Sequence, residues 1–327
     1  MQQLFFRLLE DRYFNRLPEE WVLRSAQESV DFVRFWLVHC FRSAASEREL
    51  ATVLFFAAKW KLEELTFLRS FWQSYTSVMD EAAELTLRNL YFQLIPQINL
   101  DHDNHLDAIA IFSFVLKFEQ QTVVSELQQG IASSYRTCLP IEMLQEIQTL
   151  SLPHLHPITV YGHQGKGSVE FDIRNNTHFP TQIPNASLVF ACVERVVAHY
   201  SGTNLAFAEP MVVLRYEVGQ FYKWHYDAIH AHTPTIESEL KQFGQRNRTA
   251  ILYLNDDFTG GETEFKAPYI QVHPKAGSVL VFDNVDCNGR TLISSLHRGC
   301  EVSTGQKWIC TQWFRDKPFW LRSGLLT

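Results

Sequence analysis

The spacing of apolar residues changes once along the chain, and this change constrains the fold more than any other feature. Before about residue 150, apolar residues recur at helical spacing, as in SVDFVRFWLVHCF and NHLDAIAIFSFVLKF. No glycine occurs before Gly130, which suits packed helices better than strands with tight turns. After SLPHLHP, residues 151–157, glycine and proline return and the period becomes two. The pattern predicts a helical part followed by a β-rich part.

A length of 327 residues favours two domains over one. We predict a helical domain over 1–150 and a second domain over 151–327. In the first, Ser46 and Glu49 have capping-box spacing ahead of an apolar run. Stacked helical hairpins and an irregular bundle are equal alternatives for its architecture. Its aromatic residues are expected in the core, and the other interpretation is a groove that recruits a polypeptide.

The second domain is predicted to be a jelly roll with one flanking helix, so the fold class of the chain is α+β. The helix is expected over residues 185–202, NASLVFACVERVVAHYSG. Short extended runs with turn residues between them follow, and this spacing is typical of a double-sheet barrel. The predicted strands are MVVLRYEV, FYKWHYD, TAILYLND, YIQVHP, GSVLVFDN and QKWICTQWF.

Charge and cysteine usage limit the classes of partner. The net charge of -7 and the pI near 6.0 argue against nucleic acid, which requires clustered Lys and Arg. The N-terminal stretch MQQLFFRLLEDRYF contains four charged residues, so it predicts neither a secretory signal nor a membrane segment. The six cysteines form no Cys-x-x-Cys pair and suggest no disulfide framework. We therefore expect a cytoplasmic protein that binds no nucleic acid and no membrane.

Two histidines and one aspartate form the candidate metal site. In FYKWHYDAIH, His225 and Asp227 are two residues apart, so on a strand they project from the same face. His297, in SSLHRGCEV, is a candidate third ligand. Two histidines with one carboxylate are the ligand set of non-haem Fe(II) oxygenases, and no His-Glu-x-x-His motif points to a zinc hydrolase. The alternative is a His-x-His site formed by His230 and His232 of IHAH.

Lys307 lies ten residues beyond His297, within the aromatic stretch QKWICTQWF. A lysine inside such a strand is costly unless its ammonium meets an anion, and a ligand with a carboxylate would supply one. The alternative is a side chain that reaches the surface. If Thr304 and Gly305 form a hairpin turn, His297 and Lys307 lie about 16 Å apart, at roughly 3.3 Å per residue.

Residues 211–314 resemble the prolyl 4-hydroxylase branch of the Fe(II)- and 2-oxoglutarate-dependent dioxygenases. The family pattern is Tyr-x-x-Gly-x-x-Tyr-x-x-His-x-Asp, then Gly-Gly-x-Thr, then His with Lys ten positions later. This chain has YEVGQFYKWHYD, GGETEF and LHRGCEVSTGQKW in that order. The close resemblance covers about a third of the chain and excludes the helical half.

The resemblance implies a set of roles for the matching residues. His225, Asp227 and His297 would hold Fe(II), and Lys307 would bind the distal carboxylate of 2-oxoglutarate. L-ascorbate is a further candidate cofactor. The implied reaction converts 2-oxoglutarate and dioxygen to succinate and carbon dioxide while an unactivated C-H bond is hydroxylated.

Four further positions match through the same resemblance. Tyr216 and Thr263 match residues close to the cosubstrate, and Arg246 and Trp313 match residues that line the peptide site. The long segment between Asp227 and Arg246 has no family pattern and is expected to form a variable loop near the mouth of the site.

Three functional interpretations follow. The first is hydroxylation of a proline in a protein or peptide, which the helical half would recruit. The second keeps the same chemistry and acts on a free amino acid or small metabolite. The third is a non-catalytic interaction protein, which would release no succinate.

Overall fold

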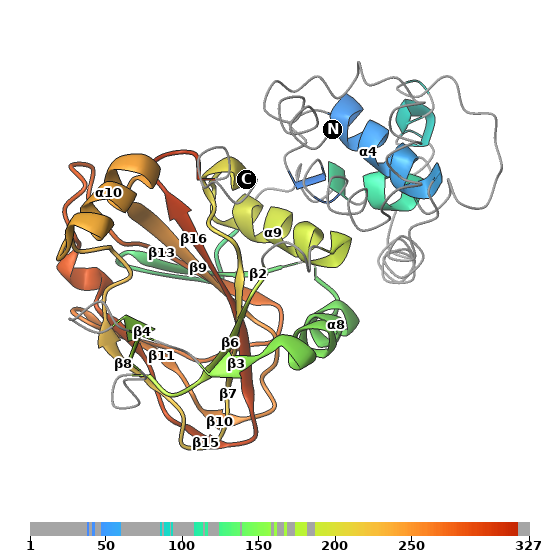
Figure 1. Cartoon of the computed structure of the whole chain (residues 1–327). Coiled ribbons are helices and arrows are strands. Elements are labelled where there is room, and N and C mark those ends of the chain that lie inside the picture. Colours follow the sequence, from blue (N-terminus) through green and yellow to red (C-terminus); the bar gives the residue numbers. More distant parts are fainter. Residues whose placement is uncertain are drawn as a thin grey trace. The chain divides into compact units, whose positions relative to one another are not determined.

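The computed structural model describes residues 38, 41–42, 47–59, 86, 88–91, 93, 108–113, 115–116, 124–137, 139–157, 160–161, 167–168, 174–181 and 187–319. The chain divides into two compact units. The first contains 1–122, 182–196 and 324–327, and the second contains 123–181 and 197–323. Figure 1 shows the second unit as a barrel of strands with helices beside it.

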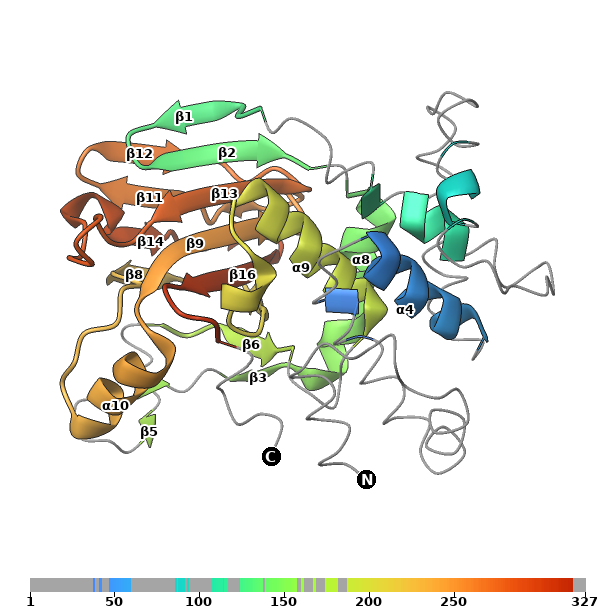
Figure 2. The same ribbon diagram turned by 90° about the horizontal axis from the view of Figure 1, so that it is seen from above.

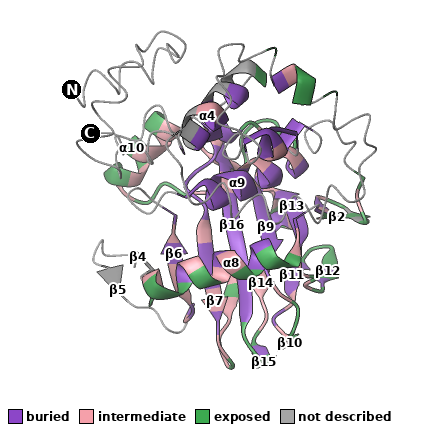
Figure 3. Cartoon of the chain, turned by 90° about the vertical axis from the view of Figure 1, so that its right-hand side faces the viewer, coloured by how far each residue is buried: buried purple, intermediate pink, exposed green. Residues whose placement is uncertain are grey.

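The larger sheet of the second unit is antiparallel, with the strand order β1-β2-β13-β9-β16-β7-β6-β3. Its strands are β1 Leu127–Gln129, β2 Ala132–Arg136, β3 His156–Pro157, β6 Thr177–Pro180, β7 Val212–Tyr216, β9 Arg246–Tyr253, β13 Ser278–Asp283 and β16 Lys307–Arg315. Figure 3 shows β9 and β16 as mostly buried, as expected for central strands.

The smaller sheet has the order β12-β11-β14-β8 and is also antiparallel. Its strands are β8 Tyr222–His225, β11 Thr263–Lys266, β12 Tyr269–Val272 and β14 His297–Gly299. Two short pairs complete the described strands: β10 Thr259–Gly260 with β15 Val302–Thr304, and β4 Val160–Tyr161 with β5 Gly167–Ser168.

The two sheets face each other and share one apolar core (Figure 1). Side chains two apart along each strand point inward, as the period of a strand requires. The ring of Phe265 on β11 meets the ring of Phe282 on β13 edge to face, with 5.0 Å between centroids. The core residues are Ala132, Leu214, Tyr216, Ile251, Tyr253, Phe265, Ile270, Val272, Leu280, Phe282, Val302 and Ile309. This mixture of helices with antiparallel sheets is consistent with the predicted jelly roll.

The described helices are α4 Glu47–Lys59, α8 Ile141–Ser151, α9 Leu188–Tyr200 and α10 Pro234–Phe243, with short 3-10 helices η2 Leu152–His154, η3 Leu205–Phe207 and η4 Ile293–Ser295. The helix predicted over 185–202 is confirmed as α9. In the second unit, α8 and α10 lie at opposite ends of the barrel (Figures 1 and 2). None of the described helices is long and apolar enough to cross a membrane.

All six predicted strand stretches contain a strand, namely β7, β8, β9, β12, β13 and β16. The hairpin of β1 and β2, with the left-handed Gly130 in its turn, was not predicted. Its residues lie before position 150 and pair with β13 in the larger sheet. The reason for the miss is physical: ASSYR has no apolar alternation, and only its pairing with β13 selects the strand.

The first unit is described in pieces, all of which are helical. In α4, Leu50, Val53 and Leu54 are buried, in agreement with helical spacing. Arg42 forms a buried ion pair with Glu194, and burial lowers the pKa of Arg42 to about 10. The predicted capping residue Ser46 lies outside the described residues.

Candidate functional site

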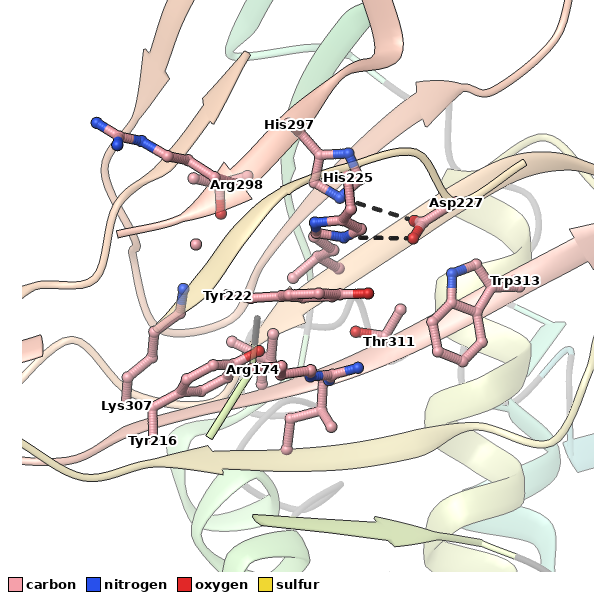
Figure 4. Close-up of a pocket in the computed structure, with 15 residues that line it drawn as sticks. Arg174, Tyr216, Tyr222, His225, Asp227, His297, Arg298, Lys307, Thr311 and Trp313 are labelled. Carbon is pink, nitrogen blue, oxygen red and sulfur yellow. Dashed lines mark ion pairs between the residues drawn. The ribbon is translucent and has the colours of Figure 1, made fainter. Parts of the chain in front are cut away.

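One cavity between the two sheets contains most of the predicted site residues (Figure 4). Its empty volume is about 410 Å³, including the part that is open to solvent. The lining residues are Arg174, Leu214, Tyr216, Tyr222, His225, Asp227, Ile251, Thr263, His297, Arg298, Gly299, Lys307, Ile309, Thr311 and Trp313.

His225, Asp227 and His297 converge at one side of this cavity. His225 on β8 and His297 on β14 are direct partners in the antiparallel pairing, which brings together residues 72 positions apart. One ligand atom from each of the three residues lies within 4.8 Å of the others. Asp227 Oδ1 is 3.5 Å from His225 Nε2, and Asp227 Oδ2 is 3.8 Å from His297 Nε2. Within the described part of the chain, no other group of three such side chains comes together.

The backbone determines which nitrogen of each histidine is free. His225 Nδ1 lies 2.7 Å from the carbonyl of Lys223, and His297 Nδ1 lies 2.9 Å from the carbonyl of Ser295. A carbonyl oxygen only accepts, so both Nδ1 atoms must be the protonated ones. Both Nε2 atoms therefore present a lone pair toward Asp227, which is the orientation a metal ligand needs.

Electrostatics favour the ligand forms of these groups. Burial lowers the pKa of His297 to about 4, and the neighbouring His225 acts in the same direction, so His297 is neutral at pH 7. Burial alone would raise the pKa of Asp227, but His297, His225 and Arg246 hold it below its ordinary value. The site thus combines two imidazoles with one carboxylate. This donor set, open on the cavity side, fits a divalent iron ion.

Lys307 is a buried cation of the cavity. Its side chain is 2% exposed, and its Nζ donates to the carbonyl of Gly261 at 2.6 Å. Burial lowers the pKa of Lys307 to about 8, and Cys300 and Glu262 offset part of this effect. It forms no ion pair with any described carboxylate, so an anionic ligand in the cavity would supply the missing counter-charge. The alternative of a surface lysine is wrong.

The expected hairpin that joined His297 to Lys307 is also wrong. β14 pairs with β8 and β11, whereas β16 pairs with β7 and β9 in the larger sheet. The chain between them forms β15, so the two residues face each other from opposite sheets. A side chain at Gly299 would project toward Lys307, since an added Cβ there would lie 4.0 Å from Lys307 Nζ.

Tyr216 and Thr263 both line the cavity, close to Lys307. Tyr216 is the register partner of Lys307, and Lys307 Nζ lies 5.3 Å from the centre of its ring. Thr263 Oγ1 is within 2.8 Å of the Tyr253 hydroxyl, which ties the smaller sheet to the larger one. Burial raises the pKa of Tyr216, and Arg174 offsets part of that shift.

Arg246 and Trp313 occupy the end of the larger sheet. Trp313 lines the cavity, and its buried indole Nε1 has no hydrogen-bond partner among the described residues. Arg246 is not among the lining residues. Its guanidinium stacks on the Trp313 ring at 4.0 Å and binds both oxygens of Glu209 at 2.6 and 2.7 Å. Arg315 binds the same carboxylate at 2.5 Å. Glu209 therefore joins the two arginines at this end of the cavity.

The alternative ligands His230 and His232 are exposed and stack on each other with 6.1 Å between ring centroids. They belong to no group of three metal-binding side chains in the described residues. The segment expected as a variable loop contains α10, which begins after Thr233. The Thr233 hydroxyl accepts from the amide of Ile236 at 3.3 Å, and Pro234 occupies the first turn.

Three polar residues near the site had no sequence signal that we recognised. Arg174 lines the cavity, stacks 4.3 Å over the Tyr222 ring and donates to Asn176 at 2.7 Å. Thr249 contacts Asp227, and Asn284 contacts Thr249. Their contacts join strands or loops that are distant in sequence, so no local spacing announces them.

Comparison with known proteins agrees with this geometry. Residues 211–315 match the family model of the 2OG-Fe(II) oxygenase superfamily. Prolyl 4-hydroxylase 1 of Arabidopsis thaliana is 32% identical over 190 residues, which cover 54% of this chain and 65% of the relative. Probable prolyl 4-hydroxylase 10 of the same plant is 30% identical over 205 residues, which cover 56% and 68%. A putative prolyl 4-hydroxylase of Acanthamoeba polyphaga mimivirus is 35% identical over 113 residues, which cover 34% and 47%.

The class defined by fold and site is thus that of the 2-oxoglutarate-dependent oxygenases. Within it, the chain belongs to the prolyl 4-hydroxylase family. The chain spans between about half and two-thirds of the length of these curated relatives.

Two solved structures are similar in part. The viral collagen prolyl hydroxylase vCPH of Paramecium Bursaria Chlorella virus-1, solved as a 2OG complex, has a TM-score of 0.43 at 22% identity and covers 56% of this chain and 95% of its own. A Pseudomonas putida prolyl-4-hydroxylase has a TM-score of 0.40 at 18% identity and covers 56% and 92%.

Proposed function

We propose that this protein is an Fe(II)- and 2-oxoglutarate-dependent dioxygenase that hydroxylates a prolyl residue in a protein or peptide. The observation that supports this most is that His225, Asp227 and His297 line the same cavity as the buried Lys307. In this family, Fe(II) with 2-oxoglutarate and dioxygen supplies hydroxylation of an unactivated C-H bond, with release of succinate and carbon dioxide.

The residues of the chain bind and orient the reactants. His225 Nε2, the Asp227 carboxylate and His297 Nε2 hold the metal ion. Lys307 donates to the distal carboxylate of the cosubstrate, in a region where burial makes such a pair strong. Apolar side chains of the larger sheet, including Ile251 and Ile309, limit the access of water to this end of the cavity.

Tyr216 and Thr263 complete the cosubstrate end of the cavity, and Trp313 with Arg246 forms the substrate end. The indole N-H of Trp313, which has no partner among the described residues, is suited to donate to a peptide carbonyl. Arg246 positions that indole by stacking on it. L-ascorbate is a further cofactor to test.

The part of the protein before the oxygenase unit is proposed to be helical and to recruit the protein substrate. The domain division near residue 150 and a cytoplasmic location remain predictions of the sequence. Removal of residues 1–122, which are the N-terminal segment of the first unit, would test recruitment. Turnover of a short peptide should persist while turnover of the intact protein partner falls.

The main test measures succinate release by the iron-loaded protein with and without proline-rich peptides, together with the peptide mass. We expect succinate release that depends on the peptide and a mass gain of one oxygen atom at proline. Succinate release without any peptide product would favour a small-molecule substrate, and no release would favour a non-catalytic role. Lys307→Ala should abolish release at ordinary 2-oxoglutarate concentrations, whereas Lys275→Ala, which changes an exposed lysine, is the matched control.

A further inference from the structure

The carboxylate of Asp227 is held from behind by two fully buried residues of the larger sheet. Thr249 is on β9 and Asn284 directly follows β13, and both are 0% exposed. Thr249 Oγ1 lies 2.8 Å from Asp227 Oδ2, and Asn284 Nδ2 lies 2.8 Å from Thr249 Oγ1. These hydrogen bonds therefore connect the larger sheet to Asp227, the candidate ligand at the edge of the smaller sheet.

The two hydrogen bonds that join Asn284, Thr249 and Asp227 can run in only one direction. The amide Nδ2 of Asn284 only donates, so the hydroxyl oxygen of Thr249 accepts from it. The single hydroxyl proton of Thr249 is then free to point at the Asp227 carboxylate, which only accepts. The opposite orientation of the Asn284 amide would compete for that proton and leave a hydroxyl lone pair against Asp227 Oδ2.

The backbone holds both members in place. Thr249 is in register with Trp313 on one side and with Phe282 on the other, in the centre of the larger sheet. The backbone N-H of Asn284 donates to the backbone carbonyl of Asn247 at 2.8 Å, and the backbone carbonyl of Asn284 accepts from the N-H of Leu292 at 3.0 Å. The donor to Asp227 is thus fixed by a rigid sheet, whereas Asp227 lies just beyond the end of β8.

We infer that Thr249, oriented by Asn284, is a positioning residue that reserves Asp227 Oδ2 and leaves Oδ1 as the metal-binding oxygen. Both carboxylate oxygens lie near the histidines, Oδ1 3.5 Å from His225 Nε2 and Oδ2 3.8 Å from His297 Nε2. Torsion about the last bond of an aspartate is soft, so without the Thr249 donor on Oδ2 both oxygens are available to one ion. A carboxylate that binds through two oxygens uses a coordination position that the reactants need. This inference rests on the proposed metal site and adds two residues to it.

The test uses Co(II) as a probe with the full-length protein, and measures Co(II) affinity by calorimetry and the visible spectrum of the bound ion. Thr249→Val keeps the shape and removes the hydroxyl. We expect Co(II) binding about 10- to 100-fold weaker, as for other residues behind a metal ligand, and a changed spectrum. Thr249→Ser retains the donor and should restore both readouts to within about threefold of the parent.

Thr181→Val is the matched control, because Thr181 is also buried and donates to a carbonyl, that of Met211, at 3.0 Å. A role in stability alone predicts that both valine variants lower the Tm and leave the Co(II) spectrum and affinity unchanged. That result for a folded Thr249→Val would overturn the inference.

If Thr249→Val does not fold, Asn284→Leu tests the same inference. It removes the donor that orients Thr249, and we expect about threefold weaker Co(II) binding, while unchanged affinity and spectrum would overturn the inference. Failure of the proposed metal site is distinguishable, because the unmodified protein would then bind no Co(II) at the site, and a different substrate would leave Co(II) binding unchanged.

Discussion

The smaller sheet and the larger sheet bring different chemistry to the same cavity. The smaller sheet and its edge provide the proposed metal ligands His225, Asp227 and His297, and the pairing of β8 with β14 sets the spacing of the two histidines. From the larger sheet come Lys307, which is buried without an ion pair to a described carboxylate, and Thr249, which orients Asp227. The difference teaches that one sheet supplies the ligands and the other supplies the charge and orientation around them.

The largest effect is expected from loss of a ligand on the smaller sheet. His225→Ala should weaken metal binding by at least about 100-fold, because two remaining donors no longer fix the ion. Equilibrium dialysis with Mn(II) or Co(II) measures this. His232→Ala is the matched control, since His232 is exposed and lies outside the cavity. Equal metal retention by both variants would show that the ion binds elsewhere.

Loss of the buried cation on the larger sheet should affect the cosubstrate and spare the metal. Lys307→Ala is expected to raise the KM for 2-oxoglutarate by about 100-fold, since removal of one member of a buried charge pair costs about 2 to 5 kcal/mol. Metal affinity should stay within about twofold of the parent. If Lys307→Ala weakens metal binding as much as it raises the KM, the two sheets do not have the separate roles proposed.

The sheets also differ in their ionic networks. Glu209, with two arginines around it, is buried at the end of the larger sheet. Glu209→Gln should therefore lower the free energy of unfolding by about 3 kcal/mol. Glu264 on the smaller sheet is also buried, but its partner Arg298 has a side chain that is 42% exposed. Solvent screens this pair, so Glu264→Gln should cost only about 1 kcal/mol. Urea denaturation of both variants measures the difference, and a larger loss for Glu264→Gln would contradict it.

A smaller effect is expected from pH. Burial lowers the pKa of Lys307 to about 8, so the ammonium form that binds a carboxylate is lost as pH rises above that value. Affinity for 2-oxoglutarate should fall about fivefold between pH 8 and 9, and bound cosubstrate should in turn raise the pKa of Lys307. Calorimetric titration at several pH values measures this. Lys307→Arg should flatten the profile because arginine stays charged, and a parent profile that is equally flat would contradict the assignment.

The strand pattern and the candidate ligand pair His225 and Asp227 could be predicted from the sequence because both follow local rules. His225 and Asp227 are two apart on one strand, and the inward positions 307, 309, 311 and 313 of β16 alternate as a strand requires. The sequence did not reveal which sheet Lys307 joins, since that depends on whether residues 300–306 form a hairpin turn or a separate strand. The structure has β15 there, paired with β10.

Contacts between distant strands account for what the sequence could not reveal. Thr249 and Asp227 are 22 residues apart, and Asn284 is 35 residues beyond Thr249. Buried threonines are common in strands, so a threonine at position 249 indicates only a core position and no functional role. Arg174 likewise precedes the short strand β6, and only the cavity that it lines indicates a role for it. The structure was needed to separate these residues from ordinary core positions.

A crystal structure of the protein with Mn(II) and 2-oxoglutarate, with anomalous scattering recorded for the metal, tests the arrangement most directly. We predict a single anomalous peak bound by His225 Nε2, Asp227 Oδ1 and His297 Nε2, and a cosubstrate carboxylate within about 3 Å of Lys307 Nζ. A peak at His230 and His232, or a cosubstrate carboxylate held away from Lys307, would contradict the assignment of ligands to one sheet and charge to the other.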